Sequence, residues 1–397
     1  MNALQQHLLE ALRSALRGEA VSWTAASNEE LDALMELAAL HKVQPLVLQA
    51  VYAAPAAKDW QGLPAARRAS KVQVMAQSLR TEAFLQLYHF LEERGSTPVV
   101  VKGILCRSLY PDGELRQSAD EDLYVAPQLF DETCNALRAY GMTCDPKADL
   151  ERDHEVGWRM DSLYVELHRS LFSPDMPVRF EEAFSDAFRR AEVYSLPNGA
   201  AVRSLCPHDH LLYLLLHAYK HFIHSGFGIR QVCDIGLWAQ RYAARVDWER
   251  LRFQCKALHA ERFAASVFRI AREDLGLTLP PVWEENEADR LPMLEDILSA
   301  GIYGTADKSR QHSAALTFSA AATGKRGGVV GSLFPPAKHL MRDYPILRRH
   351  VWLLPSVWLR RIFRYWKETR RERKNSPLQS LKLSAERKRL LKYYGII

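Results

Sequence analysis

The stretch RQSADEDLYVAP, residues 116–127, places three acidic residues directly before an apolar segment. In an extended strand, residues i and i+2 face the same side, so Asp120 and Asp122 would point the same way. Burying carboxylates is costly unless a cation meets them. The stretch therefore indicates either a solvated turn before a strand or a pair of carboxylates that holds a metal ion.

The bulk composition is that of a globular protein. The chain has 397 residues, of which 48% are hydrophobic and 25% charged, enough for two or more domains or subdomains. No apolar run is long enough to span a bilayer, and residues 1–20 lack the apolar core of a secretory signal. The six cysteines form no C-x-x-C pair, which is typical of reduced thiols, so we expect a cytoplasmic protein.

The order of the patterns predicts a small α/β core between helical regions. Residues 1–95 have helical periodicity and include a long amphipathic helix that ends at Gly95. In residues 96–205 we predict two strands, TPVVVKG and DLYVAP, and then a helix, LFDETCNALRAYG. We predict one or two further strands, with a turn near Asp161, for VGWRMDSLYVELHRSLF. Residues 206–280 are helical again, and residues 281–397 form a C-terminal region with a basic tail.

Further candidates for a metal site lie in the same core. Glu166 stands inside the apolar segment SLYVELHRSLF, and His168 shares its strand face. Together with Asp120 and Asp122, Glu166 would complete a set of oxygen ligands of the kind that Mg²⁺ prefers. Taken alone, an acidic pair at the start of a strand is usually just solvated, and Glu166 could face water from an edge strand, so the metal site depends on their combination.

A candidate phosphate-binding turn precedes the carboxylates. Gly103 ends a predicted strand and opens a helix, and such turns bind anions because their backbone N–H groups point outward. Lys102 adds a cation at the turn, and Arg116 stands just before the carboxylate pair.

This order of features resembles the nucleotidyltransferase superfamily with a DNA polymerase β-like palm. More closely, it resembles a largely uncharacterised bacterial nucleotidyltransferase family, over residues 30–280. The resemblance implies an α+β fold with a small mixed sheet as the palm-like core, flanked by N-terminal and C-terminal helical regions. The matching positions are Lys102-Gly103, Tyr110-Pro111, Arg116, Asp120-Glu121-Asp122, Glu166-Leu167-His168 and, on later helices, His217, Lys220, His221, Arg230 and Asp234.

The resemblance also implies a reaction. The protein would transfer NMP from an NTP to a hydroxyl of a small molecule or protein and release pyrophosphate. AMP is the group expected to be transferred. Asp120 and Asp122 would hold two Mg²⁺ ions, and Glu166 would bind the metal that activates the acceptor hydroxyl and accept its proton. A non-catalytic nucleotide-binding or partner-binding module with the same fold is the alternative. The nucleotide-binding residues would be Lys102, Gly103, Arg116, His168, Lys220, His221 and Arg230.

Three positions depart from the superfamily pattern. Ile104 follows the glycine where serine is usual, Glu166 stands where aspartate is common, and Glu121 lies between the two aspartates where an apolar residue is usual. A charge at Glu121 indicates that the strand begins at about Asp122 or that its start is exposed. We therefore expect Glu121→Ala to leave catalysis largely intact and Asp122→Ala to abolish it.

Other polar groups have competing interpretations. His217 and His221 lie four residues apart on a predicted helix, so they could bind zinc, contact phosphates or simply pack. Asp234 could pair with Arg230 across one helical turn. The segment GKRGGVVG, residues 324–331, lacks the Gly-Lys-Ser/Thr ending of a Walker A motif and is predicted to be a flexible loop.

The net charge of +6 is concentrated near the C-terminus, where the segment WLRRIFRYWKETRRERKN is rich in arginine, lysine and aromatic residues. Such a tail could bind nucleic acid or an anionic membrane surface. It could equally be a helix that packs on the body by its aromatic face and exposes its arginines to solvent.

Overall fold

The computed structural model of the chain describes residues 1–174, 176–224, 226–280, 289–300, 337–341, 344–360 and 386–396. The loop predicted at residues 324–331 lies outside the described residues, as does residue range 361–385 of the basic tail. In the described ranges, no helix combines the length and the apolar character needed to cross a membrane.

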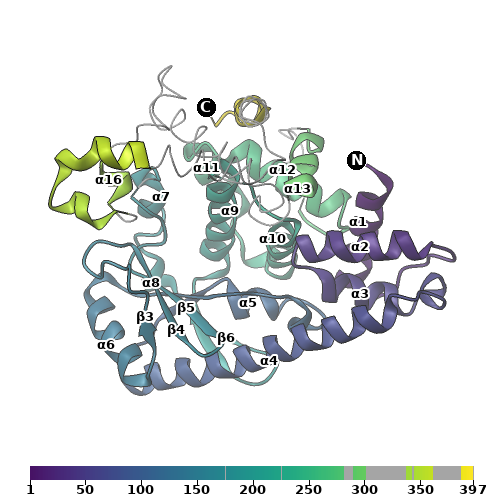
Figure 1. Ribbon diagram of the computed structural model, residues 1–397, viewed down its shortest axis with the longest axis horizontal. Coiled ribbons are helices and arrows are strands. Elements are labelled where there is room, and N and C mark those ends of the chain that lie inside the picture. Colours follow the sequence, from purple (N-terminus) through teal and green to yellow (C-terminus); the bar gives the residue numbers. More distant parts are fainter. Residues whose placement is uncertain are drawn as a thin grey trace.

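A mixed sheet of seven strands forms the centre of the fold (Figure 1). β1 (Val99–Val101) pairs antiparallel with β2 (Glu121–Tyr124), and β5 (Leu163–His168) lies parallel to β2 on its other side. The α+β fold with a mixed sheet is thereby confirmed, although β3, β6 and β7 were not predicted. The outer strands are β4 (Glu155–Met160) and β3 (Thr143–Cys144) beyond β5, and β7 (Ala201–Ser204) and β6 (Glu192–Ser195) beyond β1.

The start of β2 is more deeply buried than the sequence indicated. Both Glu121 and Asp122 belong to the strand, with 3% and 1% of their surfaces exposed. Glu121 is paired with Val165 of β5, and Asp122 lies between Val101 of β1 and Glu166 of β5. The expectation that the strand begins only at about Asp122, or has an exposed start, is wrong because strands on both sides enclose it.

β4 and β5 form the predicted hairpin. Its turn lies at Asp161, which has a φ of 50°, and the pairing runs from Met160 opposite Leu163 back to Glu155 opposite His168. The hairpin lays β5 against β2, so that Glu166 and His168 reach the strand that carries Asp122.

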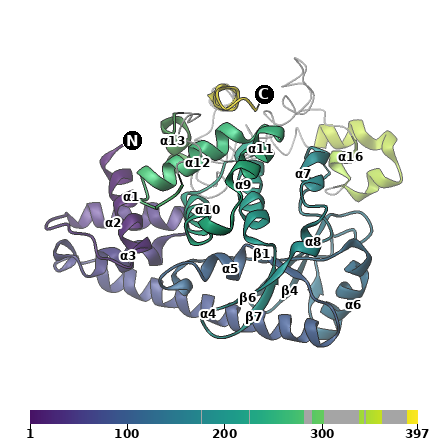
Figure 2. The same ribbon diagram turned by 180° about the vertical axis from the view of Figure 1, so that it is seen from behind.

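Helices lie on both sides of the sheet (Figures 1 and 2). α4 (Leu63–Glu93) runs below it in these views and ends as predicted, with Gly95 at a φ of 76°. The helices above it are α9 (Pro207–His224), α10 (Ile229–Arg241), α11 (Trp248–Ala257) and α12 (Glu261–Glu273).

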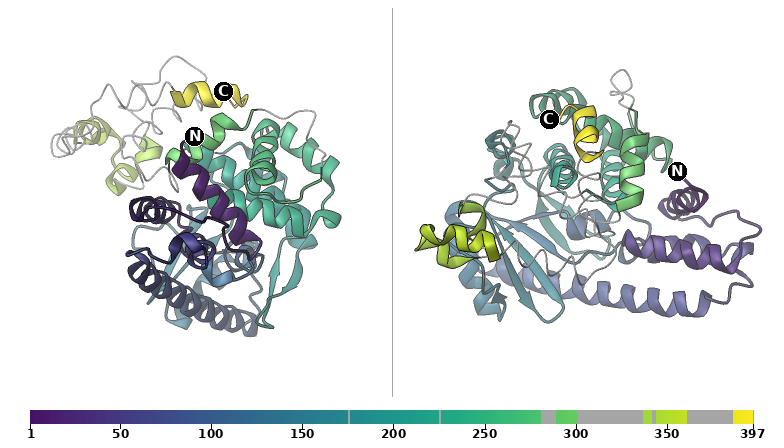
Figure 3. Two further views of the ribbon diagram at one scale, coloured as in Figure 1. Left: turned by 90° about the vertical axis from the view of Figure 1, so that its right-hand side faces the viewer. Right: turned by 45° about the horizontal axis from the view of Figure 1, so that its top comes forward.

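The N-terminal helices join the two helical layers beyond the edge of the sheet. Arg13 Nη2 donates to the carbonyl of Asp274 at 2.9 Å, so the first helix is fastened to the end of α12 (Figure 3). These helices are α1 (Ala3–Leu16), α2 (Asn28–Leu40) and α3 (Gln44–Tyr52). Further helices are α5 (Gly103–Arg107), α6 (Phe130–Tyr140), α7 (Val178–Glu182), α8 (Ala187–Arg190), α13 (Leu291–Ala300) and α16 (Ala337–Leu340).

A buried ion pair fastens α10 to the segment before β2. Asp234 accepts hydrogen bonds from Arg116 Nε at 3.1 Å, from Arg116 Nη2 at 2.6 Å and from the Tyr110 hydroxyl at 2.8 Å. Burial alone would raise the pKa of Asp234, but the Arg116 guanidinium holds it below its usual value. The predicted pairing of Asp234 with Arg230 is wrong, because the Arg230 guanidinium instead donates to the Gln117 carbonyl.

We expect Asp234→Asn to lower the free energy of unfolding by about 3–5 kcal/mol, because it leaves the buried Arg116 guanidinium without a counter-charge. Urea unfolding of both proteins measures the change. Asp186→Asn is the control, since Asp186 pairs with Arg189 on the surface, and its effect should stay within about 1 kcal/mol. Equal effects of the two substitutions would contradict a fastening role for Asp234.

Candidate metal and nucleotide site

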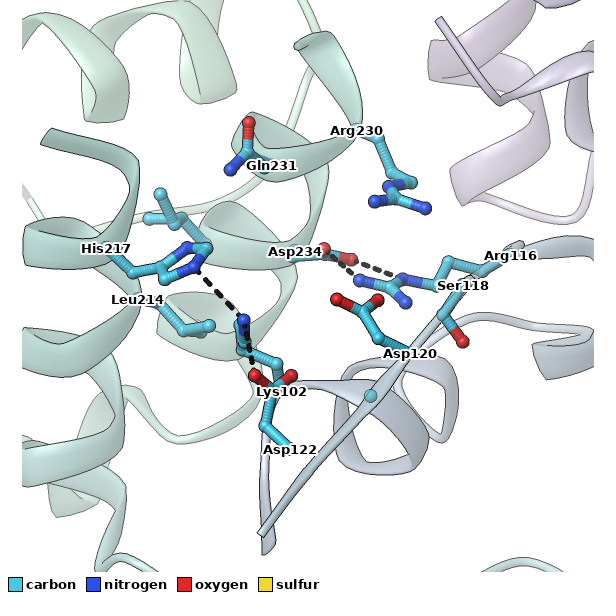
Figure 4. Close-up of a pocket in the computed structure, with 12 residues that line it drawn as sticks. Lys102, Arg116, Ser118, Asp120, Asp122, Leu214, His217, Arg230, Gln231 and Asp234 are labelled. Carbon is cyan, nitrogen blue, oxygen red and sulfur yellow. Dashed lines mark hydrogen bonds and ion pairs between the residues drawn. The ribbon is translucent and has the colours of Figure 1, made fainter. Parts of the chain in front are cut away.

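Two cavities meet at the N-terminal end of β2. The first has a volume of about 30 Å³ and is bordered by Arg116, Ser118, Arg230 and Gln231 (Figure 4). The second has a volume of about 330 Å³ and is bordered on its own side by Glu155, Glu166, His168, Tyr213, Lys220 and His221. The two cavities share Lys102, Asp120, Asp122 and His217.

The ten residues predicted for the site all border one or both of these cavities. Lys102, Asp120 and Asp122 border both. Gly103, Arg116 and Arg230 border the small cavity, and Glu166, His168, Lys220 and His221 border the large one. The fold thus brings together side chains that lie up to 128 positions apart in the chain, from Lys102 to Arg230.

Asp122, Glu166 and His168 form a group of metal-ligand type. One ligand atom from each lies within 4.8 Å of the others. The parallel pairing of β2 with β5 sets Asp122 beside Glu166, and His168 Nε2 lies 3.1 Å from Asp122 Oδ1. Two carboxylates and an imidazole fit a divalent cation, and Mg²⁺ would use mainly the carboxylate oxygens. Asp120 stands before the strand, outside this close group, although it borders both cavities.

The Asp122 carboxylate forms an ion pair with Lys102. Lys102 Nζ lies 3.0 Å from Asp122 Oδ1 and 3.0 Å from His217 Nε2. Burial alone would raise the pKa of Asp122, but the Lys102 ammonium and the hydrogen bond with His168 lower it. Asp122 is therefore ionised, the form that a metal ligand needs.

Glu166 has the opposite electrostatic environment. Burial, and then the negative charge of Asp122, raise the pKa of Glu166 to about 7. A carboxyl with a pKa near neutrality suits proton transfer, because it holds a proton in part of the molecules and releases it in the rest. The ionised Asp122 and the near-neutral Glu166 are thus suited to different tasks.

A histidine on α9 accepts the second contact of Lys102. Burial, and then the charge of Lys102, lower the pKa of His217 well below its ordinary value, so the imidazole is neutral. His221 Nε2 lies 3.2 Å from His217 Nε2, which confirms that the two histidines share one helix face. Within the described ranges no third ligand-type side chain joins these two histidines, so the structure offers no support for zinc there.

Glu155 is a carboxylate of the site that the sequence interpretation missed. It borders the large cavity, with Oε2 at 3.2 Å from His154 Nε2 and at 3.7 Å from His168 Nδ1. Burial would raise the pKa of Glu155, but these histidines and Lys220 hold it far below its usual value. Counting outward from the turn at Asp161 pairs Glu155 with His168, so the hairpin pattern contained a signal for it.

The back face of β2 carries a second buried carboxylate. Glu121 Oε1 lies 2.6 Å from Arg107 Nη1, and Glu121 Oε2 accepts the N–H of Ile104 at 2.9 Å. A Cβ on Gly103 would lie 2.0 Å from Glu121 Oε2, and Gly103 has a φ of 39°. Only glycine therefore fits the turn between β1 and α5, because Glu121 occupies the space behind it.

The turn at Gly103 is thus attached to both faces of β2. Lys102 contacts Asp122 on the front, and Ile104 contacts Glu121 on the back. Two backbone N–H groups of the turn are already engaged, since that of Lys102 donates to His210 Nε2 at 3.1 Å and that of Ile104 to Glu121. The sequence indicated that the N–H groups of this turn point outward to bind a phosphate, but these two are already used within the protein.

A sheet that carries paired carboxylates beside a glycine turn, with helices over the site, is the architecture expected of the nucleotidyltransferase class. The chain matches a family described as uncharacterised nucleotidyltransferase over residues 27–276, more than half of its length, and it belongs to this family. The family resemblance predicted from the motifs is confirmed. No curated protein and no solved structure matches the chain.

We expect Mn²⁺ to bind more tightly at pH 8 than at pH 6, by roughly tenfold, because the ligand must lose its proton and the pKa of Glu166 is about 7. Calorimetry in two buffers should detect a proton released on binding near pH 6. Glu166→Gln should abolish that proton release. An unchanged release in the variant would show that another group titrates.

The raised pKa of Glu166 also has a consequence for stability without metal. Its protonated form stabilises the native state fully below the ordinary pKa of 4.5, and this contribution is lost as the pH rises to about 7. Between these pH values, the free energy of unfolding should fall less steeply for Glu166→Gln than for the unchanged protein. Urea unfolding at a series of pH values measures the difference.

The buried position of Glu121 changes the outcome expected for its substitution. Glu121→Ala should lower the free energy of unfolding by about 3–5 kcal/mol, because it leaves the buried Arg107 unpaired. Glu121→Gln keeps an acceptor for Ile104 and should lose less. Replacement of an exposed residue, Glu182→Ala, should change the free energy by about 0.5 kcal/mol or less. Similar urea midpoints for Glu121→Ala and Glu182→Ala would exclude a structural role for Glu121.

Proposed function

We propose that the protein is a metal-dependent nucleotidyltransferase that moves NMP from an NTP to a hydroxyl acceptor and releases pyrophosphate. The observation that carries the proposal is the group formed by Asp122, Glu166 and His168, with Asp122 bordering both the small cavity and the larger one. Membership of a nucleotidyltransferase family supports the reaction class. AMP is the group we expect to be transferred, with ATP as donor.

The nucleotide phosphates belong in this proposal beside Lys102, Gly103 and Arg230. The small cavity at these residues has a volume of about 30 Å³, room for about one water molecule. A phosphate group therefore enters only when side chains move. Arg230 on α10 is the candidate to move, since its guanidinium is held by a single backbone carbonyl, that of Gln117.

For Arg116 we propose a role other than the predicted nucleotide contact. Its guanidinium makes two hydrogen bonds with Asp234, and its side chain is 5% exposed. We propose that it supports the site through α10, whereas Lys102 and Arg230 neutralise the phosphates. Lys220 and His221 border the large cavity and would act on the acceptor or on the far end of the nucleotide.

The acceptor hydroxyl belongs in the large cavity, beside Glu166. The pKa of Glu166 is about 7 without a metal, and a bound cation would lower it, so Glu166 would be ionised and able to take the proton of the hydroxyl as the oxygen attacks the α-phosphate. Asp120 and Asp122 would hold Mg²⁺ with Glu166, and the bound ions would neutralise the phosphates and lower the pKa of the hydroxyl. His168 donates to Asp122 Oδ1 and so orients that carboxylate.

The main alternative is a nucleotide-binding module without catalysis. The test is incubation with each γ-labelled NTP, Mg²⁺ and a panel of hydroxyl acceptors, with release of labelled pyrophosphate as the readout. We expect release with ATP, a loss of at least about 100-fold in kcat/KM for Asp122→Asn, and no loss for the surface control Asp186→Asn. A protein that binds Mg-ATP but never releases pyrophosphate, and whose Asp120→Ala variant binds equally well, is the module instead.

A further inference from the structure

The long helix α4 presents an apolar stripe to solvent. Its inner face buries Gln77, Phe84, Leu87, Tyr88 and Leu91 against the body. On another face, Val72, Met75 and Leu79 expose 67%, 66% and 67% of their surfaces. α4 runs along the lower border of the molecule in Figures 1 and 2, so this face is accessible to a partner.

The three exposed residues form one continuous stripe. At 3.6 residues per turn, positions i, i+3 and i+7 lie on one face of a helix. The small side chains Ala65 and Ala76 fall on the same face and are also exposed. Single exposed apolar residues are ordinary on a surface, whereas a stripe at this spacing is what a second helix packs against.

Charges flank the stripe asymmetrically. Arg67, Arg68 and Lys71 are exposed at its N-terminal end, and Glu82 is exposed at its C-terminal end. By helical geometry, Lys71 and Glu82 lie on the same flank of the stripe. Two copies of α4 side by side in opposite directions would bring the basic end of each to the acidic end of the other, whereas parallel copies would bring like charges together.

We propose that a second copy of this chain docks on α4, with the two helices antiparallel about a twofold axis near Met75 and Ala76. Such an interface is isologous, so the same patch serves both copies. Val72 and Leu79 of one copy pack across the axis on Leu79 and Val72 of the other. Lys71 of each copy faces Glu82 of its partner, as same-flank positions do in antiparallel helix pairs. Arg68 lies at the N-terminal end of the stripe itself, opposite the turn of the partner helix that carries Glu82.

The same features argue against a membrane as the occupant. An anionic bilayer attracts a helix whose polar flanks are basic throughout. Here Glu82 lies beside Leu79 at the end of the stripe, so only one half of the helix would be attracted. The dimer uses both charged ends, and it does not depend on the catalytic proposal, because no residue of the stripe borders the two cavities.

The test is sedimentation of the full-length protein over a range of concentrations. The unchanged protein should show a reversible monomer–dimer equilibrium. Met75→Glu should raise the dimer Kd by at least about tenfold, because it places two like charges at the centre of the interface. Circular dichroism checks that α4 remains folded, and pyrophosphate release should be unchanged in the monomer.

A charge exchange tests the antiparallel geometry. The variant R68E/K71E and the variant E82K should each dimerise at least about tenfold more weakly than the unchanged protein, because like charges meet in each homodimer. An equal mixture of the two should regain the dimer, since every charged contact is then between opposite signs. Recovery in the mixture supports the antiparallel pair.

Three outcomes would overturn the proposal. The first is an unchanged protein that stays monomeric up to about 100 μM, well above the Kd expected of a specific dimer. The second is a mixture that does not regain the dimer. The third is a monomeric protein that binds vesicles of anionic phospholipid through the stripe and loses this binding in Met75→Glu, which would assign the face to a membrane.

Discussion

The burial of two carboxylates side by side in β2 is the constraint on which the rest of the site depends. Glu121 and Asp122 are adjacent, so their side chains leave the strand on opposite faces. Each face must then supply a cation, because an unpaired buried charge is costly. Lys102 meets Asp122 on the front and Arg107 meets Glu121 on the back, and both cations come from the short segment around the turn at Gly103.

The ion pairs of Lys102 with Asp122 and of Arg107 with Glu121 connect the carboxylates of β2 with the turn at Gly103. Glu121 also accepts the N–H of Ile104, so the turn and the strand are held as one unit. On the front face, Glu166 and His168 reach Asp122 from β5, and a neutral His217 reaches Lys102 from α9. A metal that entered between Asp122 and Glu166 would share Asp122 with Lys102, and the ammonium would then be available to a phosphate.

The sequence predicted most local features correctly, whereas it missed features that depend on contacts between distant segments. β1, β2, α6 and the β4–β5 hairpin were predicted, because alternation and turn residues are local signals. β6 and β7 were missed, since neither contains an apolar run like the three valines of β1; β7 is held by pairing with β1, and β6 by pairing with β7. The partner of Asp234 was predicted to be Arg230, four residues away, but is Arg116, which lies 118 positions earlier.

The sequence by itself determined the family of the protein and most of the candidate residues of the site, because the Lys-Gly turn, the Asp-x-Asp pattern and the later Glu-x-His occur in a recognisable order. It also determined the strand geometry that sends Asp122 and Glu121 to opposite faces. Only the tertiary structure decided which cation meets which carboxylate, that Glu155 joins the site and that Glu121 is buried. Those outcomes depend on contacts between distant segments, and the pKa of Glu166 is about 7 only because the fold buries it beside Asp122.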